Sequence, residues 1–461
     1  MKEMSLIQIA TAVNGTYHGE TDNRSKEITG VSIDSRKINT DYLFVPIKGE
    51  RVDGHDFIAQ VAENGALCTL CERPPVDTSI SYILVDSCLQ ALKDLAKYYR
   101  STLDIKVIGI TGSVGKTSTK EMIAAILSQK FKVLKTEGNY NNEIGLPLTI
   151  FRIKETHEIA ILEMGISNFG EMHTLADIAR PDIGIITNIG FAHIEYLKDQ
   201  AGILKAKTEM FDHLNPDATV VLNGDDALLS TISSVQGRTP VFFGLSDALS
   251  VYADNIETKG IRGTSCTLHL PGETIPVNIP LPGTHMVYNA LAGAYIGHLL
   301  GLTGTQIKIG IASAMPIAGR TNVIKTDSIF IIDDCYNANP ASMKGAIDLL
   351  SEVETRSVAI LGDMFELGDE KETMHHEIGT YASRRNVDLI CCVGELSKHM
   401  YHGAKEAATT SQVHYFPTKD ELLEGLPVLL EAQDTILVKA SNGMKFTEII
   451  SNLKCLVLDS H

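Results

Sequence analysis

The sequence has no excess of positive charge. Its 40 lysines and arginines are outnumbered by 57 aspartates and glutamates, so the formal net charge is 40 − 57 = −17. A chain this acidic repels the phosphates of nucleic acids overall. We therefore expect no nucleic-acid partner, although a local basic pocket for a small phosphorylated ligand remains compatible with this charge.

Long apolar runs are also missing. The most apolar long stretch, residues 290–302, is interrupted by His298 and by glycines, and it is too short to span a bilayer. The first six residues, MKEMSL, lack the apolar centre of a signal peptide. We expect a soluble, cytoplasmic protein with no membrane-inserted segment.

The cysteines do not have the spacing of a complete metal site. Cys68 and Cys71 form one C-x-x-C, which suits a redox pair or half of a zinc site, but no second C-x-x-C or H-x-x-x-H completes it. We favour small apolar residues packed in a strand. The same interpretation holds for Cys391 and Cys392, which lie inside the apolar run 389–393.

The chain is too long for one ordinary domain. Its 461 residues are 44% hydrophobic, which is enough for several cores, and they contain no internal repeat or low-complexity segment. We predict three domains, at residues 1–104, 105–317 and 318–461. The first combines short β-like runs with a helical pattern at 87–99.

Apolar runs alternate with helix-length segments in the second and third predicted domains. The predicted strands are residues 105–110, 159–162, 183–187, 219–222, 329–333, 358–361, 389–393 and 435–438, and the predicted helices include 118–131, 342–352 and 370–385. This alternation indicates an α/β fold with doubly wound parallel sheets. Residues 250–282 have short alternating segments and Pro-Gly turns, which predict a small antiparallel insertion.

A glycine-rich segment, GITGSVGKT at 109–117, joins a predicted strand to a predicted helix. Such a loop turns its N–H groups toward phosphate oxygens, Lys116 can reach the terminal phosphates, and the Thr117 hydroxyl can bind Mg²⁺. The match to G-x-x-x-x-G-K-[ST] is not strict, because Ile110 stands at the first glycine, so an ordinary glycine-containing turn is the alternative. A NAD-binding turn lacks its first glycine here. We predict a nucleotide-binding loop of Thr111, Gly112, Ser113, Val114, Gly115, Lys116 and Thr117.

This loop resembles the phosphate loop of the Mur ligases, which build the peptidoglycan precursor peptide. Other stretches carry the resemblance along nearly the whole chain: 34–36, 44–49, 53–57, 138–147, 163–165, 206–209, 333–340, and the single residues Asn188 and His193. The resemblance implies three domains. They are a small α/β domain that binds UDP, a central P-loop mononucleotide-binding parallel sheet, and a C-terminal Rossmann-like domain that closes over ATP and the amine substrate.

The same resemblance implies an ATP-dependent amide ligase that works through an acyl phosphate, with Mg²⁺ as a cofactor. It is nearest to the family member that joins D-alanyl-D-alanine to UDP-N-acetylmuramoyl-tripeptide, and it implies a monomer. The alternatives are a Mur-type ligase that adds the third amino acid, a folylpolyglutamate-synthase-like enzyme, and a nucleotide-dependent regulatory ATPase. No N-K-x-D guanine motif is present, and residues 138–147 and 333–340 favour the first interpretation. The third residue of the tripeptide, L-lysine or diaminopimelate, and the base for the incoming amine remain open.

Several polar side chains are candidates for metal binding. Glu163 follows an apolar strand, so it is expected at the carboxyl end of a parallel sheet, where ligands bind. The resemblance makes Glu163 and His193 ligands of Mg²⁺ together with Thr117, and it makes Lys207, carbamylated by CO₂, a ligand of a second ion. Without the resemblance, Lys207 is interpreted as part of a solvated helix face. The predicted catalytic residues are Lys116, Glu163, His193, Lys207 and Arg320.

The resemblance assigns further residues to ATP: His285 and Asn289 to the adenine, Arg320 at a hinge to the γ-phosphate, and Asp334 with Tyr336 and Asn337 to the ribose. Met286 stands where the family usually has asparagine. The apolar run before Asp334 is also compatible with a Walker B strand that supplies a carboxylate to Mg²⁺, but it lies far along the chain from the loop.

Candidates for the other substrates lie on both sides of the phosphate loop. Ser35, Arg36 and Lys48 are assigned to the uridine and diphosphate, where the two cations supply local positive charge. Asn141 and Asn142 are assigned to the peptide. Residues 362–368 and His375 also match the family pattern. Residues 439–442, KASN, depart from it, because Ala440 and Asn442 replace the usual glycine and arginine.

Overall fold

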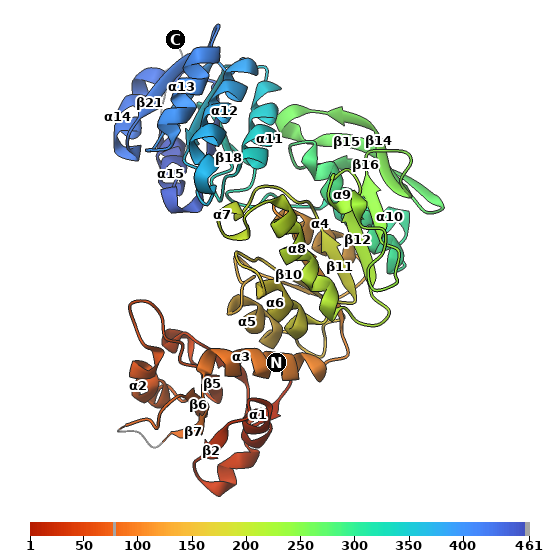
Figure 1. The fold of residues 1–461 in the computed structure, drawn as a ribbon, viewed down its shortest axis with the longest axis vertical. Helices are drawn as coiled ribbons and strands as arrows, with labels where there is room; N and C mark the ends of the chain where they lie inside the picture. The colour runs from red at the N-terminus through yellow and green to blue at the C-terminus, as the bar shows by residue number, and fades with distance from the viewer. Residues whose placement is uncertain (77–79, 457–461) are drawn as a thin grey trace. The chain divides into compact units, whose positions relative to one another are not determined.

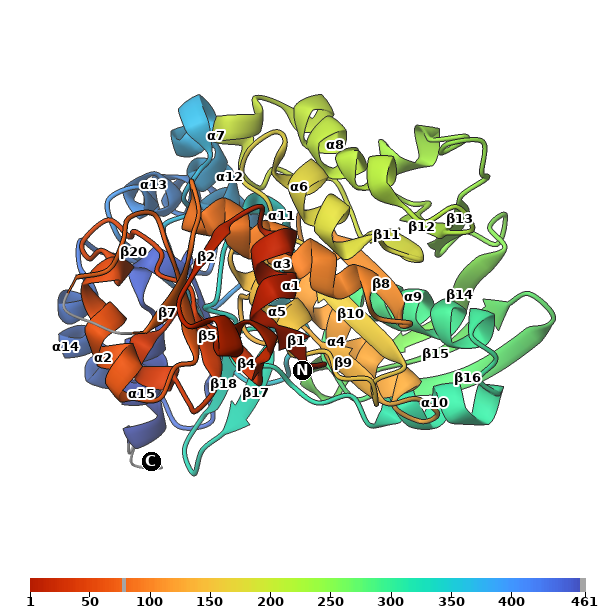
Figure 2. The same ribbon diagram turned by 90° about the horizontal axis from the view of Figure 1, so that it is seen from below.

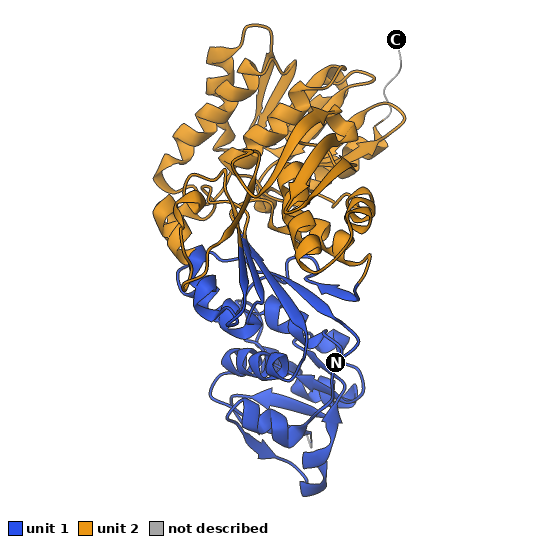
Figure 3. Cartoon of the chain, turned by 90° about the vertical axis from the view of Figure 1, so that its right-hand side faces the viewer, with its two compact units in different colours: residues 1–111, 131–185, 207–220 blue, residues 112–130, 186–206, 221–461 orange. Residues whose placement is uncertain are grey.

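The computed structural model describes residues 1–76 and 80–456, and Figure 1 shows its helices and strands. The chain forms two compact units, coloured in Figure 3. Unit 1 contains residues 1–111, 131–185 and 207–220. Unit 2 contains residues 112–130, 186–206 and 221–461.

The N-terminal residues form a five-stranded sheet with the order β2-β7-β6-β5-β4. Its neighbours pair in parallel, except that β2 is antiparallel to β7. The Ser87 hydroxyl caps the last helix of this segment by accepting a hydrogen bond from the Gln90 N–H. The elements are β1 (Met4–Ser5), α1 (Leu6–Ala12), β2 (Thr16–His18), β3 (Glu27–Ile28), β4 (Gly30–Ser32), β5 (Tyr42–Phe44), α2 (Ile58–Glu63), β6 (Cys68–Cys71), β7 (Ser81–Leu84) and α3 (Cys88–Ser101).

A second sheet has nine strands in the order β16-β15-β14-β13-β12-β11-β8-β10-β9. In unit 1, β10 pairs in parallel with β8 and with β9. The elements up to residue 213 are β8 (Lys106–Thr111), α4 (Lys116–Leu127), β9 (Val133–Lys135), α5 (Gly145–Phe151), β10 (Ile159–Glu163), α6 (Glu171–Ala179), β11 (Ile183–Ile186), α7 (Ile194–Leu197), α8 (Gln200–Thr208) and the 3-10 turn η4 (Glu209–His213).

The predicted antiparallel insertion is the edge of this same sheet. In unit 2, β13 pairs in parallel with β12 and with β14, and from β14 onward the pairing becomes antiparallel. Figure 2 shows β14, β15 and β16 side by side. The elements here are β12 (Thr219–Asn223), β13 (Val241–Gly244), β14 (Val251–Thr258), β15 (Thr264–Leu270), β16 (Glu273–Ile279), α9 (His285–Leu299) and α10 (Gly304–Ala312). The alternating sequence indicated antiparallel strands, but it carried no information about the strand against which they pair.

The C-terminal residues form a six-stranded sheet with the order β17-β18-β22-β19-β20-β21. All neighbours pair in parallel except β17, which is antiparallel to β18. The elements are β17 (Asn322–Lys325), β18 (Phe330–Asp333), α11 (Pro340–Ser351), β19 (Ser357–Gly362), α12 (Lys371–Arg384), β20 (Leu389–Val393), α13 (Ser397–Ala407), β21 (Gln412–Phe416), α14 (Lys419–Leu429), β22 (Thr435–Lys439) and α15 (Thr447–Cys455).

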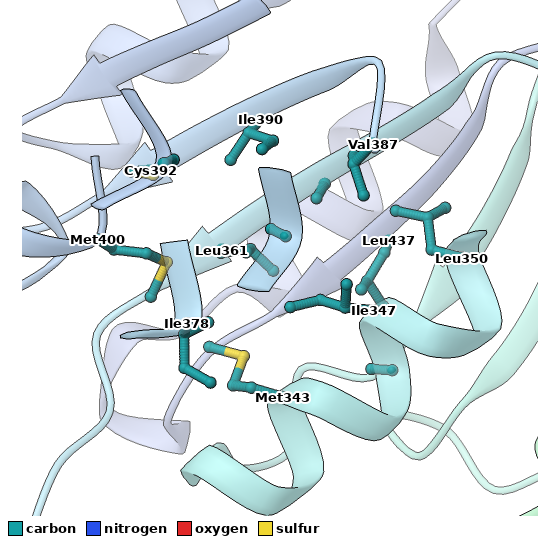
Figure 4. Packing of buried hydrophobic residues seen from close by; sticks show 14 of the residues in the cluster. Met343, Ile347, Leu350, Leu361, Ile378, Val387, Ile390, Cys392, Met400 and Leu437 are labelled. Carbon is teal, nitrogen blue, oxygen red and sulfur yellow. The ribbon is translucent and has the colours of Figure 1, made fainter. Parts of the chain in front are cut away.

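Helices bury both faces of the C-terminal sheet. One core, shown in part in Figure 4, packs Met343 and Ile347 of α11 and Ile378 of α12 against strand residues such as Leu437. A separate core includes Leu422 and residues of α15. Because parallel sheets need cover on both faces, the near-continuous apolar runs seen in the sequence are expected.

These sheets confirm the predicted α/β class. The predicted boundary at 104/105 falls between α3 and β8, and the one at 317/318 falls between α10 and β17. As domain boundaries, both remain predictions. Within the described part of the chain, no helix combines the length and apolar character needed to cross a membrane.

Candidate active site

The glycine-rich segment forms a tight loop at the start of α4. Gly112 has φ +151° and Gly115, the N-cap of the helix, has φ +83°, conformations that glycine adopts most readily. A Cβ at Gly112 would lie 1.9 Å from the Thr187 Oγ1 atom, so no side chain fits there. Lys116 begins α4, two residues earlier than predicted, and its ammonium donates a hydrogen bond to the Gly112 carbonyl at 2.7 Å.

Residues after β11 brace this loop. The Asn188 amide accepts a hydrogen bond from the Val114 N–H at 2.9 Å and donates one to the Val114 carbonyl at 2.9 Å. The Thr187 hydroxyl donates to the same carbonyl at 2.6 Å, and the Gly190 N–H donates to the Ser113 hydroxyl at 2.9 Å. The loop is therefore preorganised by side chains 74 residues away in sequence. The resemblance to the Mur ligases includes Asn188, but the sequence alone indicates no function for this residue.

The remaining loop residues are largely covered. Thr111 and Thr117 are buried, and Val114 and Gly115 are partly exposed. The buried Thr111 hydroxyl has no hydrogen-bond partner among the described residues. Buried polar groups usually have a partner, so an unsatisfied hydroxyl beside a phosphate loop is compatible with a ligand-binding role.

A pocket in unit 2 lies beside the phosphate-loop helix. It is lined by Ser118, Glu121 and Met122 of α4, by Leu281 and Met286, and by residues 314–317, Arg320 and Thr321. Asn289 is buried near this region, where its side-chain oxygen accepts a hydrogen bond from the Thr119 hydroxyl at 2.9 Å and its NH₂ group lies 3.2 Å from the Met286 sulfur. Much of the Asn289 amide is thus already engaged within the protein.

The predicted ribose and γ-phosphate residues lie together in unit 2. The Arg320 guanidinium carbon lies 4.1 Å from the centroid of the Tyr336 ring. The Asp334 carboxylate accepts a hydrogen bond from the Thr321 N–H at 2.9 Å and pairs with the Lys439 ammonium at 2.6 Å. Crowding by protein atoms is the largest cause of the lowered pKa of His285, although the residue is exposed. The Asp334 charge raises this pKa and the Lys439 charge lowers it. His285 is the first residue of α9.

Glu163 and Lys207 are both buried in unit 1. Glu163 ends β10 with 1% of its surface exposed and accepts a hydrogen bond from the Asn141 amide at 2.9 Å. Lys207, near the end of α8, is also 1% exposed. The interpretation of Lys207 as part of a solvated helix face is therefore wrong, because the helix turns this lysine inward while Lys205 stays exposed.

His193 lies in unit 2 at the start of α7, with φ +60°. Its Nδ1 atom is 2.5 Å from the Glu366 carboxylate, and Glu366 also has a positive φ, +61°. Contact with His193 lowers the pKa of Glu366. Strained backbone at two partners in one contact often marks a functional position.

The described residues contain no cluster of three or more His, Cys, Asp or Glu side chains arranged for a metal ion. The predicted ligand set is of a different kind, because it includes the Thr117 hydroxyl and a chemically modified lysine. A carbamate on Lys207 would convert a buried amine into an oxygen ligand, and oxygen ligands suit Mg²⁺. The residues present therefore fit the ion chemically.

The predicted substrate residues of unit 1 already have partners within the protein. The Arg36 guanidinium pairs with the Asp34 carboxylate at 2.9 Å, and this hydrogen bond is the main cause that lowers the pKa of Asp34 to about 2. Asn142 accepts hydrogen bonds from the N–H groups of Ile144 and Gly145, at the start of α5. Ser35 is partly exposed.

Lys48 is exposed on a tight loop that bridges back to Asp53. The His55 ring holds this loop, because its Nδ1 atom lies 2.7 Å from the Asp53 carboxylate and its Nε2 accepts a hydrogen bond from the Glu72 N–H at 3.1 Å. The stretch 53–55 belongs to the Mur ligase resemblance, but the sequence alone indicates no function for it. The sequence feature that could have indicated this contact is an aspartate followed two residues later by a histidine.

The cysteines support the packing interpretation. Cys68 and Cys71 are both fully buried in β6, and both are free thiols. Burial raises the pKa of Cys71 to about 11, which disfavours the reactive thiolate. Cys391 and Cys392 are likewise buried, in β20.

A glycine-rich loop after a strand of a parallel sheet is followed along the chain by a Rossmann-like sheet, with Arg320 just before its strand β17 and Asp334 just after its strand β18. This arrangement defines a nucleotide-dependent α/β enzyme. Comparison with known families makes this specific. Residues 27–100 match the model "Mur ligase family, catalytic domain", residues 110–297 match "Mur ligase middle domain", and residues 319–442 match "Mur ligase, glutamate ligase domain".

Individual relatives match over almost the full chain. The UDP-N-acetylmuramoyl-tripeptide–D-alanyl-D-alanine ligase of Bacillus subtilis is 38% identical over 460 residues, which covers 98% of this chain and 99% of that protein. The crystal structure of MurF from Acinetobacter baumannii aligns with a TM-score of 0.91 at 31% identity and covers 99% of this chain and 100% of that one. The MurF ligase of Thermotoga maritima in complex with ADP aligns with a TM-score of 0.82 at 28% identity, over 92% and 97% of the two chains.

This chain belongs to the Mur ligase family. It is an ATP-dependent ligase, as expected from the sequence, and the relative solved with ADP supports its use of ATP. The predicted three-domain α/β fold agrees with these structures.

Proposed function

We propose that this protein joins D-alanyl-D-alanine to UDP-N-acetylmuramoyl-tripeptide with hydrolysis of ATP, in the synthesis of the peptidoglycan precursor that serves cell shape and division. The observation that carries the proposal is full-length similarity, at 38% identity, to a ligase whose name states this reaction. The stretches at 138–147 and 333–340 support the same choice over a ligase that adds the third amino acid or a folylpolyglutamate-synthase-like enzyme.

The reaction needs an activated acid, because a carboxylate is a poor electrophile. The terminal carboxylate of the tripeptide attacks the γ-phosphorus of ATP, ADP leaves, and an acyl phosphate forms. The amine of the dipeptide then attacks the carbonyl carbon, the amine loses a proton, and inorganic phosphate leaves as the amide forms. The protein has to hold the phosphates, align the reactants and exclude water.

The phosphate loop performs the first task. Backbone N–H groups at 112–117 and the N-terminal end of α4 face the phosphates, and the Lys116 ammonium neutralises charge that accumulates during transfer. Asn188 and Thr187 hold the loop in this shape before ATP arrives. Arg320 supplies a second cation toward the γ-phosphate, and Asp334, Tyr336, Asn337, His285 and Asn289 hold the ribose and adenine.

Mg²⁺ supplies charge neutralisation and orientation of the phosphate oxygens when it is bound. Thr117, Glu163 and His193 provide its protein ligands in this proposal, and Lys207 provides a further one as a carbamate. The burial of both Glu163 and Lys207 supports these roles, because ionisable side chains are rarely buried and those that are often belong to functional sites. Asn141 orients the Glu163 carboxylate through its hydrogen bond at 2.9 Å.

The other substrates lie outside the phosphate loop. Ser35, Arg36 and Lys48 hold the uridine and diphosphate, and Asn141 and Asn142 lie toward the peptide. The Arg36 side chain is exposed and pairs with the Asp34 carboxylate. Such a surface ion pair contributes little stability, so exchanging it for a diphosphate costs little. We place the protein in the cytoplasm, where ATP is available, as a monomer.

A phosphate-release assay with a matrix of UDP-peptides and amine acceptors tests the function. We expect release only when UDP-N-acetylmuramoyl-tripeptide and D-alanyl-D-alanine are present together. Activity with UDP-dipeptide and a single amino acid, but not with this pair, would replace the proposal by the ligase of the preceding step. Release without any amine acceptor would indicate a regulatory ATPase.

The carbamate has a separate test. We expect Lys207→Ala to lose activity by about two orders of magnitude or more, because a metal ligand is removed, and to regain part of it with added short carboxylates such as acetate. Lys205→Ala is the matched control, since Lys205 lies on the same helix and is exposed. Full activity of unsupplemented Lys207→Ala would remove the carbamate from the proposal.

A further inference from the structure

Lys439 is a buried lysine to which the proposed chemistry gives no role. It is the last residue of β22, and 2% of its surface is exposed. Lysine is rarely buried this completely, and a buried ammonium is costly unless it is paired. Its position at the carboxyl end of a parallel strand is the edge where ligands of such sheets bind.

Among the described residues, the hydrogen bonds of the Lys439 ammonium all lead to one loop. Nζ lies 2.6 Å from the Asp334 carboxylate, 3.0 Å from the Asn337 carbonyl oxygen and 3.4 Å from the Asp334 carbonyl oxygen. An ammonium has three hydrogens to donate, so each has an acceptor here. The side chain therefore fixes both the charge and the backbone of residues 334–337.

The same loop fastens the segment that carries Arg320. The Thr321 N–H donates to the Asp334 carboxylate at 2.9 Å, and the Gly319 N–H donates to the Asp333 carboxylate at 2.9 Å. The Tyr336 N–H donates to the Gly319 carbonyl at 3.0 Å. Thr321 has φ +51°, a strained conformation that these bonds maintain.

We infer that Lys439 is a positioning residue for ATP, acting through Asp334 and Asn337. It neutralises a carboxylate that would otherwise repel the triphosphate, and it holds that carboxylate with a lone pair still available for a ribose hydroxyl. Through the loop it also fixes the segment that carries Arg320. This inference rests on the proposed nucleotide site and extends it to a residue that does not touch the nucleotide.

The test needs a variant that destabilises the same domain without affecting the nucleotide edge. Arg356 and Asp434 provide it, because they form a second ion pair at the opposite end of β22, with 2.9 Å between Nη1 and Oδ2 and with Asp434 fully buried. Lys439→Met and Arg356→Met each remove the cation of such a pair. Both are measured in the full-length protein for Tm, for ADP affinity by calorimetry, and for the KM of ATP and kcat.

We expect Tm to fall in both variants, while only Lys439→Met weakens ADP and raises the KM of ATP, by about tenfold, with a smaller change in kcat. The KM of the UDP substrate stays unchanged. Equal effects of the two variants on ADP affinity and on the KM of ATP would overturn the inference and leave Lys439 as a structural residue.

A double variant separates the two roles further and serves if Lys439→Met does not fold. Asp334→Asn combined with Lys439→Met leaves no unpaired charge, so Tm recovers, while ADP affinity stays as low as in Asp334→Asn alone. Recovery of wild-type ADP affinity in the double variant would overturn the inference. The ADP measurement needs no acceptor substrate, so it separates failure of this inference from failure of the proposed ligation, which would appear as phosphate release by the wild type without the dipeptide.

Discussion

At the scale of single residues, Lys116 is the lysine of the glycine-rich loop. It lies at the first position of α4 and is partly exposed, and its ammonium bonds to the Gly112 carbonyl. This contact places the ammonium over the loop, and ATP phosphates can replace the carbonyl as its acceptor.

We predict that Lys116→Ala reduces phosphate release by about 10²- to 10³-fold, because a preorganised cation is removed from the transferring phosphoryl group. Steady-state assays at saturating ATP measure the loss, and Tm checks that the fold persists. Lys308→Ala is a suitable control, since Lys308 is an exposed lysine of α10. Normal turnover by Lys116→Ala would remove the phosphate loop from the proposed chemistry.

His375 makes stability depend on pH. It is fully buried in α12; its Nε2 accepts a hydrogen bond from the Met364 N–H at 2.9 Å, and its Nδ1 lies 2.6 Å from the Lys371 carbonyl. This arrangement requires a neutral ring with the proton on Nδ1. Burial is the largest of the causes that lower its pKa. The unfolded chain therefore takes up a proton at a higher pH than the folded chain does.

We predict that the free energy of unfolding falls as pH drops below about 6.5, the unfolded pKa of histidine, by at most about 1.4 kcal/mol per pH unit until the folded pKa is reached. Urea unfolding at about pH 7.5 and about pH 5.5 measures this change. His375→Gln removes the titrating group, so its stability should change less between these conditions. If both proteins lose the same stability on acidification, His375 is not the source.

The sequence could predict some of these residues and not others. The four apolar residues before Glu163 indicated that it ends a buried strand, and it does. The burial of Lys207 did not follow from its helical pattern, since the face that packs inward depends on neighbours elsewhere in the chain. The roles of Asn188 and Lys439 depend on partners 74 and 105 residues away, which no local pattern reveals.

At the scale of elements, the turn from β8 into α4 depends on two glycines with different constraints. A Cβ at Gly112 would meet the Thr187 hydroxyl at 1.9 Å, and this hydroxyl braces the loop through the Val114 carbonyl. A Cβ at Gly115 would meet nothing closer than 3.7 Å, so only its positive φ opposes a side chain.

We predict that Gly112→Ala abolishes measurable ADP binding, because the added methyl displaces the brace and reshapes the loop. Gly115→Ala should cost about 1–2 kcal/mol of stability from backbone strain and retain ADP binding. Calorimetric titration with ADP and thermal unfolding compare the two. Equal loss of ADP binding in both variants would mean that backbone conformation, and not the steric fit against Thr187, controls the loop.

The predicted strands of the two parallel sheets were found close to their expected bounds, because buried parallel strands are continuous apolar runs. Edge strands were harder to recognise. The strands β17 and β21 were not predicted, since β17 is partly exposed and β21 mixes Gln412 and His414 with apolar residues. The pairing of β14 with β13 could not be predicted, because alternation specifies a face and not a neighbour.

At the scale of the whole molecule, the C-terminal sheet has the features of an independent domain. All the buried members of its two cores lie between residues 329 and 453, and of the partly buried residues packed against them, only Ile261, from the segment between β14 and β15, comes from outside the C-terminal part of the described chain. Its helices cover both faces of a six-stranded sheet. The proposed boundary at 317/318 falls inside the short turn bridged by Ile317 and Arg320, a few residues before β17 begins.

We predict that residues 318–461, expressed alone, fold into a stable α/β domain. The fragment keeps the complete sheet and both cores, and its length is within the usual range of about 50–250 residues for a domain. Circular dichroism should show cooperative thermal unfolding, and Ile347→Ala should lower its Tm, because a core leucine- or isoleucine-to-alanine change costs about 2–5 kcal/mol. A fragment that unfolds without cooperativity, or whose Tm does not respond to this core substitution, would show that the sheet depends on the rest of the chain and that the boundary is misplaced.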